Sequence, residues 1–141
     1  MSHSLFRVWV HVILGTKLRE PILTEEIRAM LIPHLRATFE KNNCIVRIID
    51  GVEDHLHALF LLSRTKSMAE IMKAVKGESA HWLNTQVFDG TFRWQVGYGG
   101  FSVSGHDVER VIRYIGNQKQ HHRSVSNDQE FKMITQGEWS K

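Results

Sequence analysis

The sequence is poor in the features that mark secreted, fibrous and membrane proteins. Cys44 is its only cysteine, so no intrachain disulfide can form and a disulfide-bonded extracellular scaffold is excluded. It has two prolines and no repeat or low-complexity tract, which argues against a linker-rich or repetitive architecture. No apolar run approaches the roughly 20 residues of a membrane span. The N-terminus lacks the layout of a secretory signal, so we expect a cytoplasmic protein without a membrane partner.

The net positive charge of the chain is also small. Lysine and arginine number 18 and aspartate and glutamate 15, which gives a net charge of +3. Such a balance permits a polyanionic partner without requiring one. The length of 141 residues and the hydrophobic content of 42% suit one compact domain. We predict a single domain over residues 1–141, with a core at about residues 5–123 and a polar tail at 124–141.

Hydrophobic patterning predicts alternating strands and helices. The predicted strands cover residues 4–14, 44–50 and 52–62, with short strands within the glycine-broken stretch 92–104. The predicted helices begin after Thr24, at Ser67 (to Gln86) and at Gly105 (to Arg123). The first six elements follow the βαββαβ order of a ferredoxin-like sheet. The expected fold class is therefore α+β, with two helices on one face of the sheet and a C-terminal helix free to cover the other.

Short local signals predict where some of these elements begin and end. Thr24 suits an N-cap, and Ser67 with Glu70 fits a capping box at the start of the second helix. Pro33 removes a hydrogen bond within the first helix and is expected to kink or split it. Asp50–Gly51 is a turn signal, so the strand at 52–62 is expected to return from it as a hairpin.

Two histidines stand out in the apolar run "VEDHLHALFLL". His55 and His57 are two residues apart, so on a strand their side chains share one face, and that face should look out from the open side of the sheet. Asp54 is expected to point to the opposite face. Neutral imidazoles bind metals, but a pair needs at least a third ligand to hold a metal well. The alternative is a pair of partly exposed histidines without a function.

The last predicted helix carries a polar stripe. Tyr114, Asn117, Gln118 and His121 lie at helical spacing, opposite the valines and isoleucines. Basic residues surround the stripe and suit phosphate binding, although an ordinary charged surface would look the same. The basic candidates for DNA contact on the last two helices are Lys73, Lys76, Arg110, Arg113, Lys119 and Arg123. Trp82 and Trp94 are expected in the core and not as stacking platforms.

Four segments together resemble a known family. "DHLHALF" resembles the motif of HUH nucleases, and "RVIRYIGNQKQHH" resembles the tyrosine helix of single-tyrosine HUH transposases, which include the REP-associated relatives. "HVILGTKLREPIL" and "WQVGYGGFSVS" resemble the segments that precede these motifs in the family. The resemblance spans about residues 5–123. Leu18 replaces a common aromatic residue and Glu53 a common proline, and neither position touches the chemistry.

The resemblance implies a function and roles for particular residues. Tyr114 would be the catalytic nucleophile, and His55, His57 and Gln118 would hold a divalent metal, Mg²⁺ or Mn²⁺. The protein would be a DNA transposase that cuts and rejoins single-stranded DNA at hairpin-bearing element ends, through a 5′-phosphotyrosine intermediate. It would act as a homodimer with active sites shared between the subunits.

Three other functions are compatible with parts of the sequence. A non-catalytic single-stranded nucleic-acid-binding module could use the same sheet, although such modules carry aromatic residues where His55 and His57 stand. A metallohydrolase could be built on the histidine pair, but such sites usually have further ligands close by. A host-adapted HUH nickase that processes repeat elements would share the chemistry of a transposase.

Overall fold

The computed structural model describes residues 4–117. Its strands and helices are β1 (Trp9–Gly15), α1 (Glu25–Lys41), β2 (Ile45–Val52), β3 (His55–Leu61), α2 (Met68–Gln86), β4 (Gly99–Val103) and α3 (Val108–Gly116), with 3-10 turns η1 (Lys17–Arg19) and η2 (Gly105–Asp107). All strand pairs are antiparallel, in the spatial order β2-β3-β1-β4. The ferredoxin-like α+β fold is therefore confirmed.

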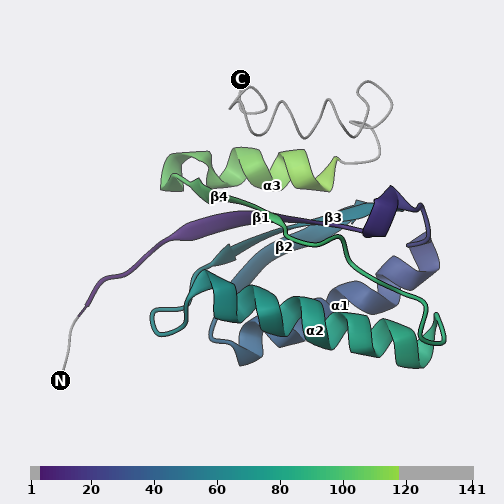
Figure 1. The fold of residues 1–141 in the computed structure, drawn as a ribbon. Helices are drawn as coiled ribbons and strands as arrows, with labels where there is room; N and C mark the ends of the chain where they lie inside the picture. Colours follow the sequence, from purple (N-terminus) through teal and green to yellow (C-terminus); the bar gives the residue numbers. More distant parts are fainter. Residues whose placement is uncertain (1–3, 118–141) are drawn as a thin grey trace.

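Helices cover both faces of the sheet (Figure 1). Helices α1 and α2 pack on one face and α3 lies on the other. The larger hydrophobic core lies between the sheet and α1 and α2, and it includes Leu35, Phe39, Phe60, Ile71 and Val75. A smaller core lies under α3 and consists of Leu59, Val103, Val108, Val111 and Ile115. Because each fully buried side chain of this kind contributes roughly 1.5–3 kcal/mol, the layer of α1 and α2 supplies most of the stability.

The predicted N-caps of α1 and α2 are confirmed, whereas a split of α1 at Pro33 is not found. The Thr24 side chain accepts a hydrogen bond from the Ile27 amide, and Ser67 and Glu70 form a reciprocal capping box. These hydrogen bonds, first from the Ser67 backbone and then from its side chain, lower the pKa of Glu70. Helix α1 runs without a break through Pro33. Pro33 is exposed, so water can satisfy the carbonyl that its missing N–H leaves without a partner.

The turn of the β2–β3 hairpin lies three residues later than the sequence predicts. Residues 53–54 form the turn, and Gly51 lies within β2, opposite Leu56 of β3. A Cβ atom on Gly51 would overlap the carbonyl oxygen of His55 and lie 2.7 Å from the Leu56 Cα. Glycine is thus needed here for close packing of two backbones, which explains why a turn-like residue pair occurs inside a strand.

Replacing Gly51 with alanine is expected to destabilise the protein by about 2–3 kcal/mol, because only a shift of the β3 backbone can relieve the overlap. Thermal unfolding should show a fall in Tm of several degrees. Gly77→Ala on α2 is the matched control, since nothing lies within 4 Å of its added methyl group and alanine favours a helix. Equal stability of the two variants would contradict the close-packing role of Gly51.

The boundaries of the first strand, of the glycine-broken stretch and of the last helix also differ from the prediction. The first strand begins at Trp9 and not at residue 4, and a single strand, β4, forms within the glycine-broken stretch. The last helix is preceded by the turn η2 and is described only to residue 117. Trp94 is buried as expected, and Trp82 is half-buried against the core. None of the helices within residues 4–117 is long and apolar enough to cross a membrane.

Candidate active site

His55 and His57 lie on β3 and face α3, as their strand alternation predicts. Leu56 points the other way, into the larger core. In the antiparallel pairing, His57 lies opposite Ile13 and His55 opposite Gly15 of β1. The two imidazoles are 1% and 0% exposed, so they do not look out from an open face. They are instead buried on the face of the sheet that α3 covers, with their ring centroids 5.0 Å apart.

Tyr114 of α3 lies directly beside this histidine pair. Its ring centroid is 5.7 Å from that of His57 and 6.3 Å from that of His11, in edge-to-face geometry. The buried side chains of Val111 and Ile115 hold α3 on the sheet and so set the position of Tyr114. The tyrosine therefore lies at the margin of the buried helix face and not on a solvated stripe. The structure thus places the phenol of Tyr114 beside the imidazole pair of β3, which is far from Tyr114 in the sequence.

Each histidine of the pair makes a hydrogen bond through Nδ1. His55 Nδ1 lies 2.8 Å from Oδ1 of Asp54, and His57 Nδ1 lies 2.8 Å from Nε2 of His11 on β1. The prediction that Asp54 points away is wrong, because Asp54 belongs to the hairpin turn, where strand alternation does not apply. Sequence reasoning also gave no role to His11. Its signals were a polar residue in an otherwise apolar strand and its place at the start of the family-like segment "HVILGTKLREPIL".

The turn η1 places an arginine next to Asp54. Leu18 and Arg19 both have positive φ values, 57° and 55°, a conformation that costs non-glycine residues of order 1 kcal/mol or more each. This backbone brings Arg19 Nε to 4.0 Å from Oδ2 of Asp54. Thr16 fixes the same turn, since its amide donates to the Asp54 carbonyl over 3.0 Å. Strained backbone thus positions a cation close to His55.

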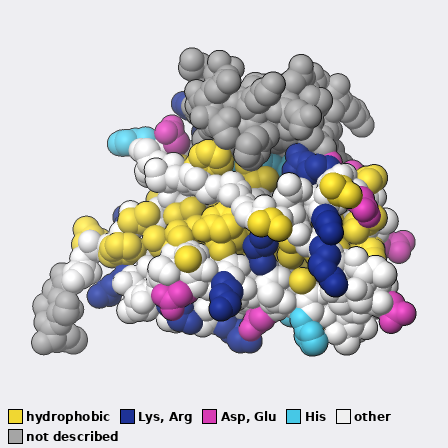
Figure 2. Space-filling view, viewed as in Figure 1, with side chains coloured by type: hydrophobic (Ala, Val, Ile, Leu, Met, Phe, Trp, Pro, Cys, Tyr) yellow, Lys and Arg dark blue, Asp and Glu magenta, His cyan; other side chains and the backbone are white. Residues whose placement is uncertain are grey.

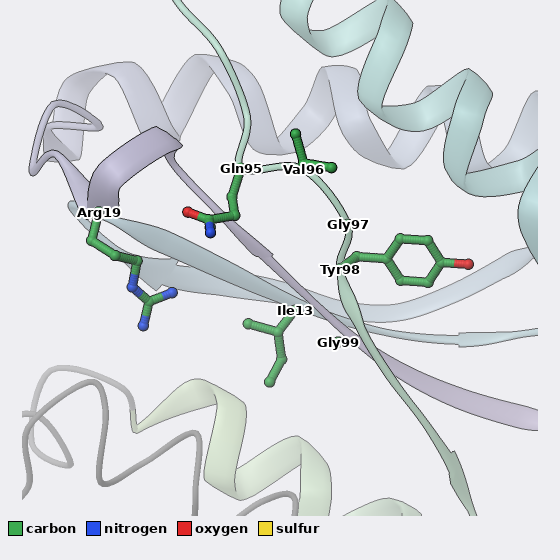
Figure 3. Close-up of a pocket in the computed structure, with 8 residues that line it drawn as sticks. Ile13, Arg19, Gln95, Val96, Gly97, Tyr98 and Gly99 are labelled. Carbon is green, nitrogen blue, oxygen red and sulfur yellow. The ribbon is translucent and has the colours of Figure 1, made fainter.

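A hollow of about 450 Å³ opens beside the histidines, between η1 and the segment that leads into β4. Ile13 and Gly15, whose partners on β3 are His57 and His55, form part of its wall. Figure 3 shows the Gln95 amide pointing toward Arg19 across it, whereas the ring of Tyr98 points away from Arg19. The hollow therefore joins a cationic group to the histidine face of the sheet.

The structure describes only part of the predicted metal site. His55 and His57 are placed side by side, but Gln118 lies outside the described residues. Within residues 4–117 no three His, Cys, Asp or Glu side chains group as a metal site. Two imidazoles with engaged Nδ1 atoms have the chemistry to ligate through Nε2 and would need a further donor such as Gln118.

The predicted DNA-contacting residues fall on both sides of the sheet. Lys73 and Lys76 lie on α2, whereas Arg110 and Arg113 lie on α3, so the structure does not gather them into one patch (Figure 1). Lys119 and Arg123 are outside the described residues. The ammonium group of Lys76 donates to the carbonyl oxygens of Gln95 and Gly97, and its burial lowers the pKa of Lys76. Lys76 therefore supports the segment before β4.

Comparison with known proteins gives a consistent picture. The sequence model of a protein family described as "Transposase IS200 like" matches residues 4–118. A crystal structure of a proposed transposase from Deinococcus radiodurans R1 is 24% identical, with a TM-score of 0.69, and the match covers 84% of this chain and 95% of that one. The structure of a REP-associated tyrosine transposase bound to a REP hairpin is 12% identical, with a TM-score of 0.67 and coverage of 89% and 74%. No curated protein sequence matches the chain.

Proposed function

Because the chain belongs to the family of IS200-like transposases, we propose that it cuts and rejoins single-stranded DNA through a covalent bond to Tyr114. The position of Tyr114 beside His57 is the observation that carries this proposal. A phenol is a nucleophile, and a pair of imidazoles is a site for a cation that neutralises a phosphate. A ferredoxin-like sheet by itself would support many functions, so the residues that meet on its α3 face are what favour this one.

In the proposed reaction the Tyr114 phenol loses its proton and its oxygen bonds to phosphorus. The bond from phosphorus to the 3′ oxygen breaks, and that oxygen takes up a proton to become a free 3′-hydroxyl. The DNA downstream stays joined to Tyr114 through its 5′ phosphate. Since a phosphodiester replaces a phosphodiester, a 3′-hydroxyl of another strand can reverse the attack and join the ends without a nucleotide cofactor.

Transposases of this family generally use a divalent metal, and we propose that His55, His57 and Gln118 would hold Mg²⁺ or Mn²⁺ here. Such an ion supplies charge for the non-bridging oxygens of the scissile phosphate. Arg19, at the rim of the hollow, would bind a neighbouring phosphate of the same strand. The imidazoles, buried from water, would act in surroundings where electrostatic interactions are strong.

The proposed DNA substrate carries a hairpin next to the cleavage site. The REP-associated relative was solved with a REP hairpin, which supports this choice of partner. The basic candidates on α2 and α3 lie on opposite layers, so a bulky hairpin and a single strand could contact different sides of the molecule. Duplex regions would then be bound through phosphates and the unpaired strand through the histidine face.

We also propose a homodimer, because β4 is an edge strand whose outer side pairs with no other strand within residues 4–117. Figure 2 shows hydrophobic side chains in a band from the N-terminal segment along this edge, and Leu5 and Phe6 are among the exposed ones. Strand β1 cannot supply such an edge, because it lies between β3 and β4. Within one chain Tyr114 already lies beside its own His57, so exchange of the tyrosine between subunits stays a prediction.

Mixing two inactive variants tests whether the sites are shared. Tyr114→Phe chains and His55→Ala, His57→Ala chains should each fail to cut DNA. If the subunits share sites, a heterodimer joins the intact tyrosine of one chain to the intact histidines of the other, and cleavage returns to at most one site per dimer. A mixture that stays inactive, although subunit exchange is demonstrated with differently tagged chains, would show that each chain builds its own site.

The proposed reaction itself is tested with a hairpin oligonucleotide that carries an unpaired, labelled extension. With Mg²⁺ or Mn²⁺ the wild-type protein should form an adduct that survives denaturing electrophoresis, and mass spectrometry should place the DNA on Tyr114. A binding module would retard the oligonucleotide on a native gel without an adduct. Cleavage without an adduct would instead favour a metallohydrolase.

A further inference from the structure

A third histidine, His11, is buried beside the two histidines of β3 and is not used in the chemistry proposed above. It is 0% exposed, and its ring stacks on that of His57 with centroids 5.1 Å apart and an interplanar angle of 28°. Burying an imidazole costs hydration energy that an aliphatic residue would not lose. A strand position that needed only packing would be filled by valine or isoleucine, as at the neighbouring Val12 and Ile13.

The hydrogen bond that Asp54 accepts determines which nitrogen of His55 is protonated. A carboxylate only accepts hydrogen bonds, so the Nδ1 of His55, 2.8 Å from Oδ1 of Asp54, carries the proton. In a neutral imidazole the other nitrogen then has the free electron pair. His55 is therefore set to offer Nε2 to a cation.

The contact between His11 and His57 permits two arrangements of its proton. If His11 Nε2 donates, His57 accepts at Nδ1 and its Nε2 is protonated, so this ring cannot ligate through Nε2. If His57 Nδ1 donates to His11 Nε2, then Nε2 of His57 has the electron pair, as in His55. Only the second arrangement lets both imidazoles of the pair ligate one ion through the same type of nitrogen.

We propose that His11 and Asp54 are positioning residues that accept hydrogen bonds from Nδ1 of His57 and His55, so that both rings present Nε2 to a shared divalent cation. The two acceptors come from different elements, β1 and the β2–β3 turn. Each is held independently: His11 is fixed by the β1–β3 pairing, and the Asp54 backbone by its hydrogen bond from Thr16. This inference rests on the proposed function for the identity of the ligand, whereas the proton positions exist without it.

The proton positions are tested by long-range ¹H–¹⁵N correlation NMR of the metal-free, ¹⁵N-labelled protein at a pH at which its imidazoles are neutral. The nitrogen that lacks a proton resonates well downfield of the one that has it, so each tautomer is read directly. We expect Nδ1–H for His55 and His57, and an unprotonated Nε2 for His11. Protonated Nε2 on either β3 histidine would overturn the inference, whatever the protein does with metal or DNA.

Metal affinity supplies the second test, with the EPR signal of free Mn²⁺ as the readout. His11→Phe keeps the ring volume but removes the acceptor, and Asp54→Ala removes the other acceptor, so each should weaken Mn²⁺ binding about 10- to 100-fold. His11→Gln offers an amide oxygen near the position of Nε2 and should restore most of the affinity. His34→Phe, which alters a histidine stacked on Trp82 in the opposite layer, is the matched control and should bind as wild type does.

The pattern of results separates this inference from the proposed function. Equal Mn²⁺ affinity in His11→Phe, His11→Gln and wild type would overturn the positioning role, even if the wild type cuts DNA. A wild-type protein that binds no Mn²⁺ would count against the proposed metal site, and the NMR spectrum would still decide the direction of both hydrogen bonds. If His11→Phe does not fold, as judged by thermal melting, the glutamine variant and the NMR spectrum decide.

Discussion

Replacing Tyr114 with phenylalanine is expected to lower the rate of DNA cleavage by at least about a thousandfold while DNA binding stays nearly unchanged. The substitution removes one oxygen and keeps the ring. The contacts with His57 and His11 are made by the ring, so α3 should keep its place on the sheet. Single-turnover cleavage of a labelled single-stranded oligonucleotide measures the rate, and fluorescence anisotropy measures the affinity.

Tyr98→Phe is the matched control for this experiment. Tyr98 is the chain's other tyrosine and lies on the segment before β4, where its ring points away from Arg19 (Figure 3). Its phenylalanine variant should cut DNA at close to the wild-type rate. A Tyr114→Phe protein that still forms a covalent adduct would show that another residue is the nucleophile.

The second large effect is expected from the double variant His55→Ala, His57→Ala. Removal of both imidazoles should reduce Mn²⁺ affinity by more than about a hundredfold and abolish cleavage, because Gln118 alone offers a single weak donor. Isothermal titration calorimetry with Mn²⁺ and the cleavage assay measure the two effects. Chelation of the metal with EDTA should inactivate the wild type in the same way, and added Mn²⁺ should restore its activity.

A second double variant controls for the number of histidines lost. His81 and His106 are both exposed, lie on α2 and η2, and are not among the residues that line the hollow. Their replacement by alanine should leave tight Mn²⁺ binding and cleavage intact. If the two double variants lose Mn²⁺ affinity to the same extent, the ion binds to surface histidines and the proposed site is wrong.

The histidine pair and the tyrosine could be identified from the sequence because local spacing carries the information. An interval of two residues on a strand places His55 and His57 on one face, and the structure confirms that placement. The antiparallel sheet and the capping residues Thr24 and Ser67 were likewise accessible, since strand and helix-end signals depend on near neighbours. The pairing of Tyr114 with the histidines required the family resemblance, because no local pattern joins α3 to β3.

The features that were missed depend on contacts between distant residues. Asp50–Gly51 has the composition of a turn, yet Gly51 is needed where the backbones of β2 and β3 approach closely. The turn forms instead at residues 53–54. This shift moves Asp54 out of the strand and next to His55. His11 is a polar residue in an otherwise apolar strand, but no local pattern predicts its contact, because its partner His57 is 46 residues away in the sequence. Sequence spacing predicts which residues share a face of a strand. Only the register of the sheet shows which residues of neighbouring strands lie side by side.

The division of the hydrophobic interior by the sheet has a consequence for how the protein tolerates sequence change. Damage to the large core under α1 and α2 would reduce the amount of folded protein, and both binding and catalysis would fall together. The small core of Leu59, Val103, Val108, Val111 and Ile115 instead sets the position of the helix that carries Tyr114. Substitutions there can alter turnover in a chain that remains folded. Natural sequence variation in the small core could therefore change the reaction rate. Variation in the large core would instead be limited by the need to keep the protein folded.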